Sequence, residues 1–223
     1  METLTDTPPR FTVRHIVLLA IVLRLALGAT AWHATHDTSA FRQPDSADYL
    51  NLAVNTAAHL TYGTLVFDLY SDKAPITSAG WNEIGADLSR TPGYPIFLAI
   101  PVFAISLATG TMSPCVNPDW VFTFWTVGTQ ALLGGLTAWL TFLCARELNC
   151  SSNTGRLAAL LVAIDPVSIA LSNYILTETL YTTLIAGACL FLLMAMREPC
   201  WRGIVPAGFL LAAAAYVRPI GLY

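Results

Sequence analysis

Charged side chains are scarce in this sequence. Only 11% of the 223 residues are Asp, Glu, Lys or Arg, whereas 55% are hydrophobic. A soluble domain needs a larger charged fraction, about 25% on average, to cover its surface with polar groups. This composition excludes a water-soluble globular protein, and we expect an all-α polytopic membrane protein.

Other features are missing as well. The chain has no run of Lys and Arg and a net charge of -3, which argues against a nucleic-acid partner. Its five cysteines show no Cys-x-x-Cys or other metal-ligand spacing, so we interpret them as small apolar residues rather than a disulfide framework. No internal repeat or low-complexity segment points to another class of protein.

Apolar runs dominate what is present. A hydrocarbon core of ~30 Å takes ~20 helical residues to cross, and five runs approach or exceed that length. They lie at 15–32, 121–144, 157–175, 179–196 and 203–217. We expect about five transmembrane helices in a single membrane domain, 1–223. The last run is short, and its continuation past Arg218 stays open.

The first run also resembles a cleaved signal peptide. Arg10 and Arg14 precede it, and an Ala-x-Ala pattern ends it at 29–31. Arg24 interrupts the apolar stretch, which favours an uncleaved anchor.

The charges are sorted by position. An acidic segment follows the first run, within an outer loop that we place at 35–120, and the later breaks are short and basic. If 94–110 does not cross the bilayer, the arginines at both short breaks and at the N-terminus all face the cytoplasm, as the positive-inside rule favours. Those arginines are Arg10, Arg14, Arg146, Arg156, Arg197 and Arg202. We therefore predict an interfacial helix at 94–110, with an ordinary sixth span as the alternative.

A second interfacial helix is predicted near 46–60. Leu50, Ala53, Ala57 and Leu60 recur at helical spacing on one face, and polar residues occupy the other. Asp45 precedes this helix, where its carboxylate could serve simply as an N-terminal cap.

Two more charged residues face the same outer side in this topology. Glu178 opens the fourth span, where a carboxylate suits the positive end of a helix dipole. Arg90 precedes a Pro-Gly-Tyr-Pro turn. Its side chain could simply be solvated at the membrane interface. Together with Asp45, these groups would offer an acid/base pair and an anion clamp.

Several stretches, in order, are similar to the signatures of glycosyltransferases that use polyprenyl-phosphate sugars. They are "DSADYLNLA", "RTPGYPIFLA", "ALLGGLTAWLTFLCARELNC", "IDPVSIALSNYILTETLYTTLI" and "AAYVRPIGL". The chain thus resembles the glycosyltransferase C superfamily, in the group of protein mannosyltransferases, aminoarabinose transferases and rhizobial lipopolysaccharide sugar transferases. The resemblance implies the N-terminal part of that fold.

The resemblance also implies roles for individual residues. Asp45 matches the catalytic carboxylate of the first outer loop, while Ser46 stands where the family often has a second acid, a loss for which Asp48 could compensate. Glu178 matches the acidic residue of the second outer loop. Arg90 matches the residue that contacts the lipid-linked phosphate, and we assign Tyr49, Tyr94 and Arg218 from neighbouring motifs to the same donor site.

The implied activity is inverting transfer of a sugar from a polyprenyl-phosphate donor to a hydroxyl of a glycan, lipid or protein acceptor. The enzyme would lie among the lipids of a bacterial inner membrane, with its N-terminus in the cytoplasm and its site outside. No cofactor is assigned, and a divalent metal stays open. His33 and His36 could form a metal pair, but interfacial histidines are the simpler interpretation.

Arg24 and Asp165 each fall at ~14 to 15 Å from the cytoplasmic boundary, at 1.5 Å per helical residue. Because intramembrane charges are usually paired, we predict a contact between them, with Pro166 kinking the helix. A small transporter would use these charges as a pathway, and an inactive scaffold would need neither.

The chain ends at "VRPIGLY" within the last family signature, so we expect an N-terminal module: a fragment, a remnant or half of a split enzyme.

Overall fold

The computed structural model describes residues 12–59, 62, 90–109, 119–197 and 201–218. Within these ranges the chain is all α-helical and has no strand, as the composition predicted. Eight α-helices occur, together with one short 3-10 turn at Thr38–Phe41.

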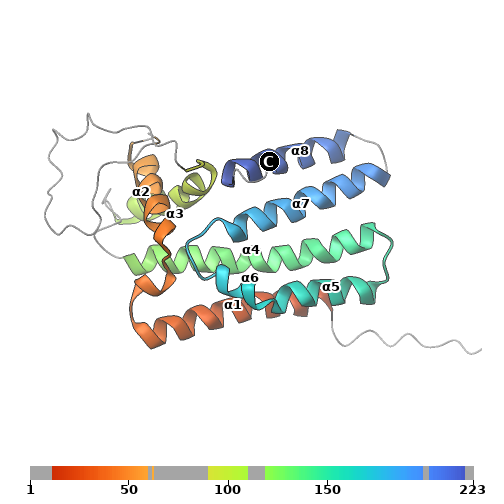
Figure 1. The fold of residues 1–223 in the computed structure, drawn as a ribbon, viewed down its shortest axis with the longest axis horizontal. Coiled ribbons are helices and arrows are strands. Elements are labelled where there is room, and N and C mark those ends of the chain that lie inside the picture. Colours follow the sequence, from red (N-terminus) through yellow and green to blue (C-terminus); the bar gives the residue numbers. More distant parts are fainter. Residues whose placement is uncertain (1–11, 60–61, 63–89, 110–118, 198–200, 219–223) are drawn as a thin grey trace, which may run out of the picture.

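Five helices lie side by side and form a bundle (Figure 1). They are α1 (Val13–Thr35), α4 (Asp119–Glu147), α5 (Ser152–Ile164), α7 (Glu178–Arg197) and α8 (Trp201–Val217). Three of them, α1, α4 and α7, are long and apolar enough to cross a membrane, while α5 and α8 are shorter apolar helices. The chain is therefore an integral membrane protein, and a count of five spans stays a prediction.

Small side chains let three of these helices approach closely. Ala20 of α1, Ala138 of α4, and Ala159 and Ala163 of α5 are all buried in one cluster with Ile16. In a bilayer, where lipid is as apolar as leucine, close van der Waals packing of this kind holds helices together.

The run at 157–175 is not one helix, and the prediction of a continuous span there is wrong. Helix α5 ends at Ile164, and α6 (Pro166–Leu171) starts a new direction. Pro166 has no N–H and cannot continue a helix, and the Asp165 carboxylate accepts from Ser168 N at 2.7 Å to cap α6. The kink predicted at Pro166 is instead a complete break between two helices.

Arg24 stabilises this break from the neighbouring helix. Its side chain is 2% exposed, and Nη1 donates to the carbonyls of Ala20 and Ala163 at 2.9 and 3.2 Å. A carbonyl in the last turn of a helix lacks a helical donor, and the guanidinium supplies one, with a positive charge at the negative end of α5. No ion pair joins Arg24 to Asp165 in the described part of the chain, so the predicted pairing of these two charges is not seen, although Asp165 acts on Arg24 electrostatically.

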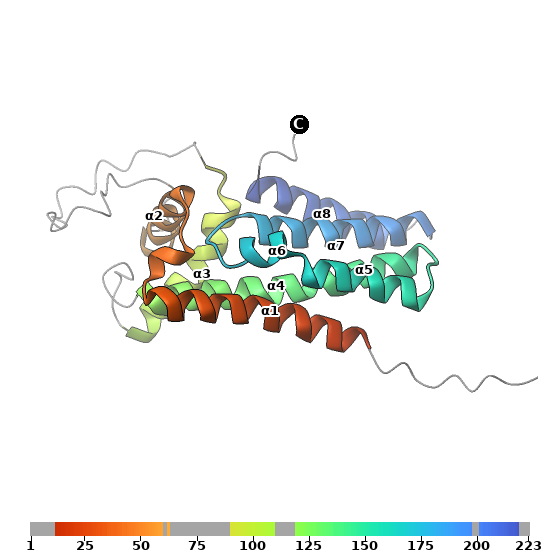
Figure 2. The same ribbon diagram turned by 60° about the horizontal axis from the view of Figure 1, so that its bottom comes forward.

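Two further helices lie crosswise at one end of the bundle, α2 (Pro44–His59) and α3 (Gly93–Thr109) (Figures 1 and 2). A buried cluster joins them to the ends of the long helices: Tyr49, Leu50, Ala53, Tyr94, Leu98, Ala99, Val102, Phe122, Ile175 and Val217. Helices thus occupy both ranges predicted for the outer loop, and their place at a membrane interface stays a prediction.

The opposite end of the bundle carries the starts of α1, α5 and α8 and the ends of α4 and α7 (Figure 1). Arg14, Arg146, Arg156, Arg197 and Arg202 fall in or beside these elements. The end with α2 and α3 and the basic end are therefore distinct, as the topology without a crossing at 94–110 requires.

Candidate functional site

An ion-pair cluster joins the start of α2 to the residue before α3. Asp45 and Asp48 are one helical turn apart and share a face. Arg90 Nη2 lies 2.7 Å from Asp45 Oδ1 and 3.0 Å from Asp48 Oδ2, and Arg90 Nε donates to Asp48 at 3.3 Å. Three residues assigned separately from the sequence thus meet in one place.

This cluster is accessible rather than buried. The side chains of Arg90, Asp45 and Asp48 are 29%, 51% and 49% exposed. Hydrogen bonding to Asp48 and Asp45 raises the pKa of Arg90 above its ordinary value. Arg90 Nη1 donates no hydrogen bond to any described residue, so one edge of the guanidinium remains able to take an anion.

The start of α2 shows what Asp45 and Ser46 do. The Asp45 carboxylate accepts no bond from the described backbone and instead pairs with Arg90, so the capping alternative does not describe it. Ser46 is fully buried, and its hydroxyl donates to the Ile175 carbonyl at 2.9 Å. Ser46 therefore links α2 to the segment before α7 by a hydrogen bond. The second carboxylate that contacts Arg90 belongs to Asp48.

A second ion pair lies at the start of α7. Arg218 Nη1 donates to Glu178 Oε1 at 3.1 Å. The other oxygen, Oε2, is buried and has no hydrogen-bond partner in the described part of the chain. Glu178 is thus a carboxylate with one oxygen held by arginine and one unsatisfied acceptor.

Tyr49 lies between the two ion pairs. The Arg90 guanidinium sits 5.5 Å from the centre of its ring, in cation–π contact. Burial raises the pKa of the Tyr49 phenol, and its other electrostatic partners include Asp45, Glu178 and Arg218. Both pairs therefore surround one phenol, and the structure brings together all of the predicted site residues except Tyr94, which lies behind.

Tyr94 supports Tyr49 from behind. The two rings meet edge to face with centres 5.1 Å apart, and Tyr94 is fully buried. Gln130 of α4, also fully buried, donates from Nε2 to the Tyr94 hydroxyl at 3.0 Å. Sequence reasoning missed Gln130, although a polar side chain inside the apolar run 121–144 is the available signal.

The Pro-Gly-Tyr-Pro turn fits against the end of α8. A Cβ added to Gly93 would lie 2.7 Å from backbone atoms of Tyr216 and Val217, too close for any other residue. Thr91 reinforces the contact by donating its hydroxyl to the Val217 carbonyl at 2.9 Å. This turn holds Arg90 beside Arg218 and explains why glycine is needed there.

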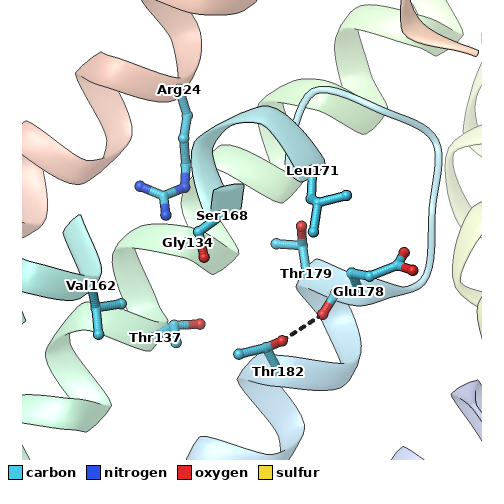
Figure 3. Close-up of a pocket in the computed structure, with 9 residues that line it drawn as sticks. All are labelled: Arg24, Gly134, Thr137, Val162, Ser168, Leu171, Glu178, Thr179 and Thr182. Carbon is cyan, nitrogen blue, oxygen red and sulfur yellow. Dashed lines mark hydrogen bonds between the residues drawn. The ribbon is translucent and has the colours of Figure 1, made fainter. Parts of the chain in front are cut away.

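A small cavity of about 40 Å³ with both polar and apolar lining residues lies beside Glu178 (Figure 3). Arg24 and Gly134 border one side, and Thr179 and Thr182 of α7 border the other. The Glu178 carboxylate points away from this cavity, and its backbone carbonyl accepts from Thr182. The cavity therefore separates Arg24 from the ion pairs.

The described residues contain no group of three or more His, Cys, Asp and Glu side chains that could hold a metal ion. His33 and His36, the pair considered from the sequence, pack edge to face with ring centres 5.7 Å apart. Asp45 and Asp48 are the nearest pair of carboxylates at the site, and both are engaged by Arg90.

The described part of the chain is thus a bundle of apolar helices with a cluster of ion pairs and tyrosines at one of its ends. Residues 116–223 match the family model of the dolichyl-phosphate-mannose-protein mannosyltransferases, and the chain thus carries a domain of this family. The resemblance seen in the sequence is confirmed for this region, and the family is one of glycosyltransferases that take mannose from a lipid-linked donor. No curated protein and no solved structure matches the chain.

The matched region contains α4 to α8, with Glu178 and Arg218. Asp45, Asp48 and Arg90 precede it. Their connection to the matched region is structural, through Tyr49 and through the contact of the Gly93 turn with α8.

Proposed function

We propose that this chain transfers a sugar from a polyprenyl-phosphate donor to an acceptor hydroxyl at the membrane end that carries α2 and α3. The observation that carries the proposal is the Arg90 cluster, in which one guanidinium holds Asp45 and its Nη1 has no partner among the described residues. The base, Asp45, is thereby placed next to the anion site, because the same Arg90 guanidinium forms both contacts. The family implies mannose as the sugar.

The reaction is a single displacement. Asp45 takes the proton from the acceptor hydroxyl as its oxygen forms a bond to the anomeric carbon. The bond from that carbon to the phosphate oxygen breaks, and the polyprenyl phosphate leaves with the electron pair. Attack from the face opposite the leaving group inverts the anomeric carbon.

Arg90 serves both partners of this reaction. Its contact with Asp45 orients the carboxylate, and the edge that faces away from Asp45 and Asp48 accepts the phosphate charge that develops as the bond breaks. Asp48 holds Nε and Nη2 of Arg90 and fixes the plane of the guanidinium. Its role is to position Arg90.

Glu178 completes the site from the other side of Tyr49. Oε2, which has no partner among the described residues, suits a hydroxyl donor, and Arg218 holds the other carboxylate oxygen. We assign Glu178 to orienting the acceptor. Tyr49, with its raised pKa, stays neutral at physiological pH and presents its ring to Arg90.

The test compares two neutral variants of the same cluster in membranes supplied with a radiolabelled polyprenyl-phosphate mannose and an acceptor. Asp45→Asn removes the base, so turnover should fall by about 100-fold or more, the usual contribution of a general base. Asp48→Asn removes only one support of Arg90 and should weaken donor use while leaving substantial turnover.

Equal amounts of folded protein in both variants, judged by gel filtration in detergent, make the comparison valid. Substantial turnover in Asp45→Asn would remove Asp45 from the role of base. An equal loss in the two variants would mean that the cluster acts only as a structural unit.

A further inference from the structure

A second cavity lies at the basic end of the bundle, far from the site described above. It has a volume of about 310 Å³ and lies between α1 and α5, bordered by Ile16, Asn153, Arg156, Leu157 and Leu160. Cavities of about 300–1,000 Å³ are the usual size of small-molecule sites.

The α5 residues of this cavity form one stripe. Positions 153, 156, 157 and 160 are spaced as one helix face requires. The polar members, Asn153 and Arg156, come first, within two turns of the helix start, and the apolar members, Leu157 and Leu160, follow along the helix. A polar group followed by an apolar groove is the order in which a phospholipid presents its headgroup and its acyl chain.

The charge at this end selects one type of headgroup. Arg14, Arg146, Arg156, Arg197 and Arg202 gather there in the described part of the chain, and Glu147 is paired with Arg197 at 3.0 Å. An excess of positive charge beside a groove between membrane helices favours anionic lipid.

We propose that this cavity binds one anionic phospholipid of the leaflet at the basic end. Its phosphate lies at Arg156 and Asn153, and an acyl chain packs along Leu157 and Leu160 against Ile16. The lipid fills the space between α1 and α5 at the end of the bundle opposite the transfer site. This inference depends on the membrane placement and not on the proposed chemistry.

Native mass spectrometry of the purified full chain tests the proposal. The protein is delipidated and offered equal amounts of phosphatidylglycerol and phosphatidylcholine with the same acyl chains. Wild type should retain phosphatidylglycerol in preference, and Arg156→Gln should lower that preference about fivefold, corresponding to ~1 kcal/mol for one basic residue near an anionic headgroup.

Two more variants separate the cavity from the general charge of this end. Arg202→Gln removes an exposed arginine, stacked 6.0 Å from the Trp201 ring and outside the cavity, and should leave the preference unchanged. Leu160→Trp fills the groove and should reduce retention of both lipids. An equal effect of Arg156→Gln and Arg202→Gln, or no preference in wild type, would overturn the proposal.

Discussion

Arg90 and Asp45 lie 2.7 Å apart although 45 residues separate them in the chain. Arg90 precedes α3 and Asp45 opens α2, so the contact exists only because the two crosswise helices pack against each other. The same guanidinium also holds Asp48. Whatever orders α2 against α3 therefore also assembles the candidate site.

Gln130 should matter for the site although it does not reach it. It donates to Tyr94, which packs on Tyr49, which lies under Arg90. Gln130→Leu leaves the Tyr94 hydroxyl unpaired in a buried place, at a cost of about 1–3 kcal/mol. We expect a higher KM for the lipid donor with a smaller change in kcat, measured by initial rates.

The matched control for Gln130 is Thr129→Val on the adjacent position of α4. Thr129 bonds only the Trp125 carbonyl of its own helix and is not at the site, so its KM should stay at the wild-type value. A kcat loss in Gln130→Leu without any KM change would contradict a positioning role.

The Arg24 side chain packs directly against Gly134, where any larger residue would overlap it. A Cβ at this position would overlap Nε of Arg24 and lie 2.6 Å from Cδ. Because a shift of the Arg24 side chain would disturb its bonds to the Ala20 and Ala163 carbonyls, Gly134→Ala should lower stability by about 1–3 kcal/mol. Thermal unfolding in detergent measures the change.

Gly128 in the same helix provides the comparison, because a Cβ there meets nothing within 4 Å. Gly128→Ala should be neutral or stabilising by up to about 1 kcal/mol, from helix propensity alone. If both alanine variants behave alike, the close fit of Arg24 against Gly134 does not contribute to stability.

The orientation in the membrane predicts the behaviour of reporter fusions. With α3 lying across the end of the bundle, fusions at Ser152 and Pro199 should both report the cytoplasm, and one at Ser113 should report the outer side. Enzyme reporters active on only one side of the membrane give the answer. Outer signals at Ser152 and Pro199 would mean that residues 94–110 cross the bilayer.

Much of the fold followed from the sequence because long apolar runs have few alternatives in a bilayer. The prediction of one helix at 157–175 failed for a local reason. The mean hydropathy of the run stays high although it contains Asp165 and Pro166, and these two residues interrupt the hydrogen bonding of the helix. The Arg24 contact was mispredicted for a related reason. The guanidinium donates to the Ala163 carbonyl in the last turn of α5, and no ion pair between described residues joins it to the Asp165 carboxylate.

For the site, the sequence supplied the charged residues but not their pairing. A resemblance assigned Arg90 to phosphate and Asp45 to catalysis, and nothing in the spacing indicated that the two would touch. The burial of Ser46 against Ile175 was likewise invisible, because it depends on a contact across 129 residues. Gln130 escaped notice because one polar residue in an apolar run does not reveal which side chain it meets.

The central claim is that Arg90 receives a lipid-linked phosphate. The most direct test is photo-crosslinking of the purified chain in lipid with a polyprenyl-phosphate-sugar analogue, comparing wild type, Arg90→Ala and Arg146→Ala. Arg146 lies at the opposite end and bonds Ser152, so its removal controls for loss of positive charge. The account predicts labelling in wild type and Arg146→Ala and its loss in Arg90→Ala; labelling that persists without Arg90 would contradict it.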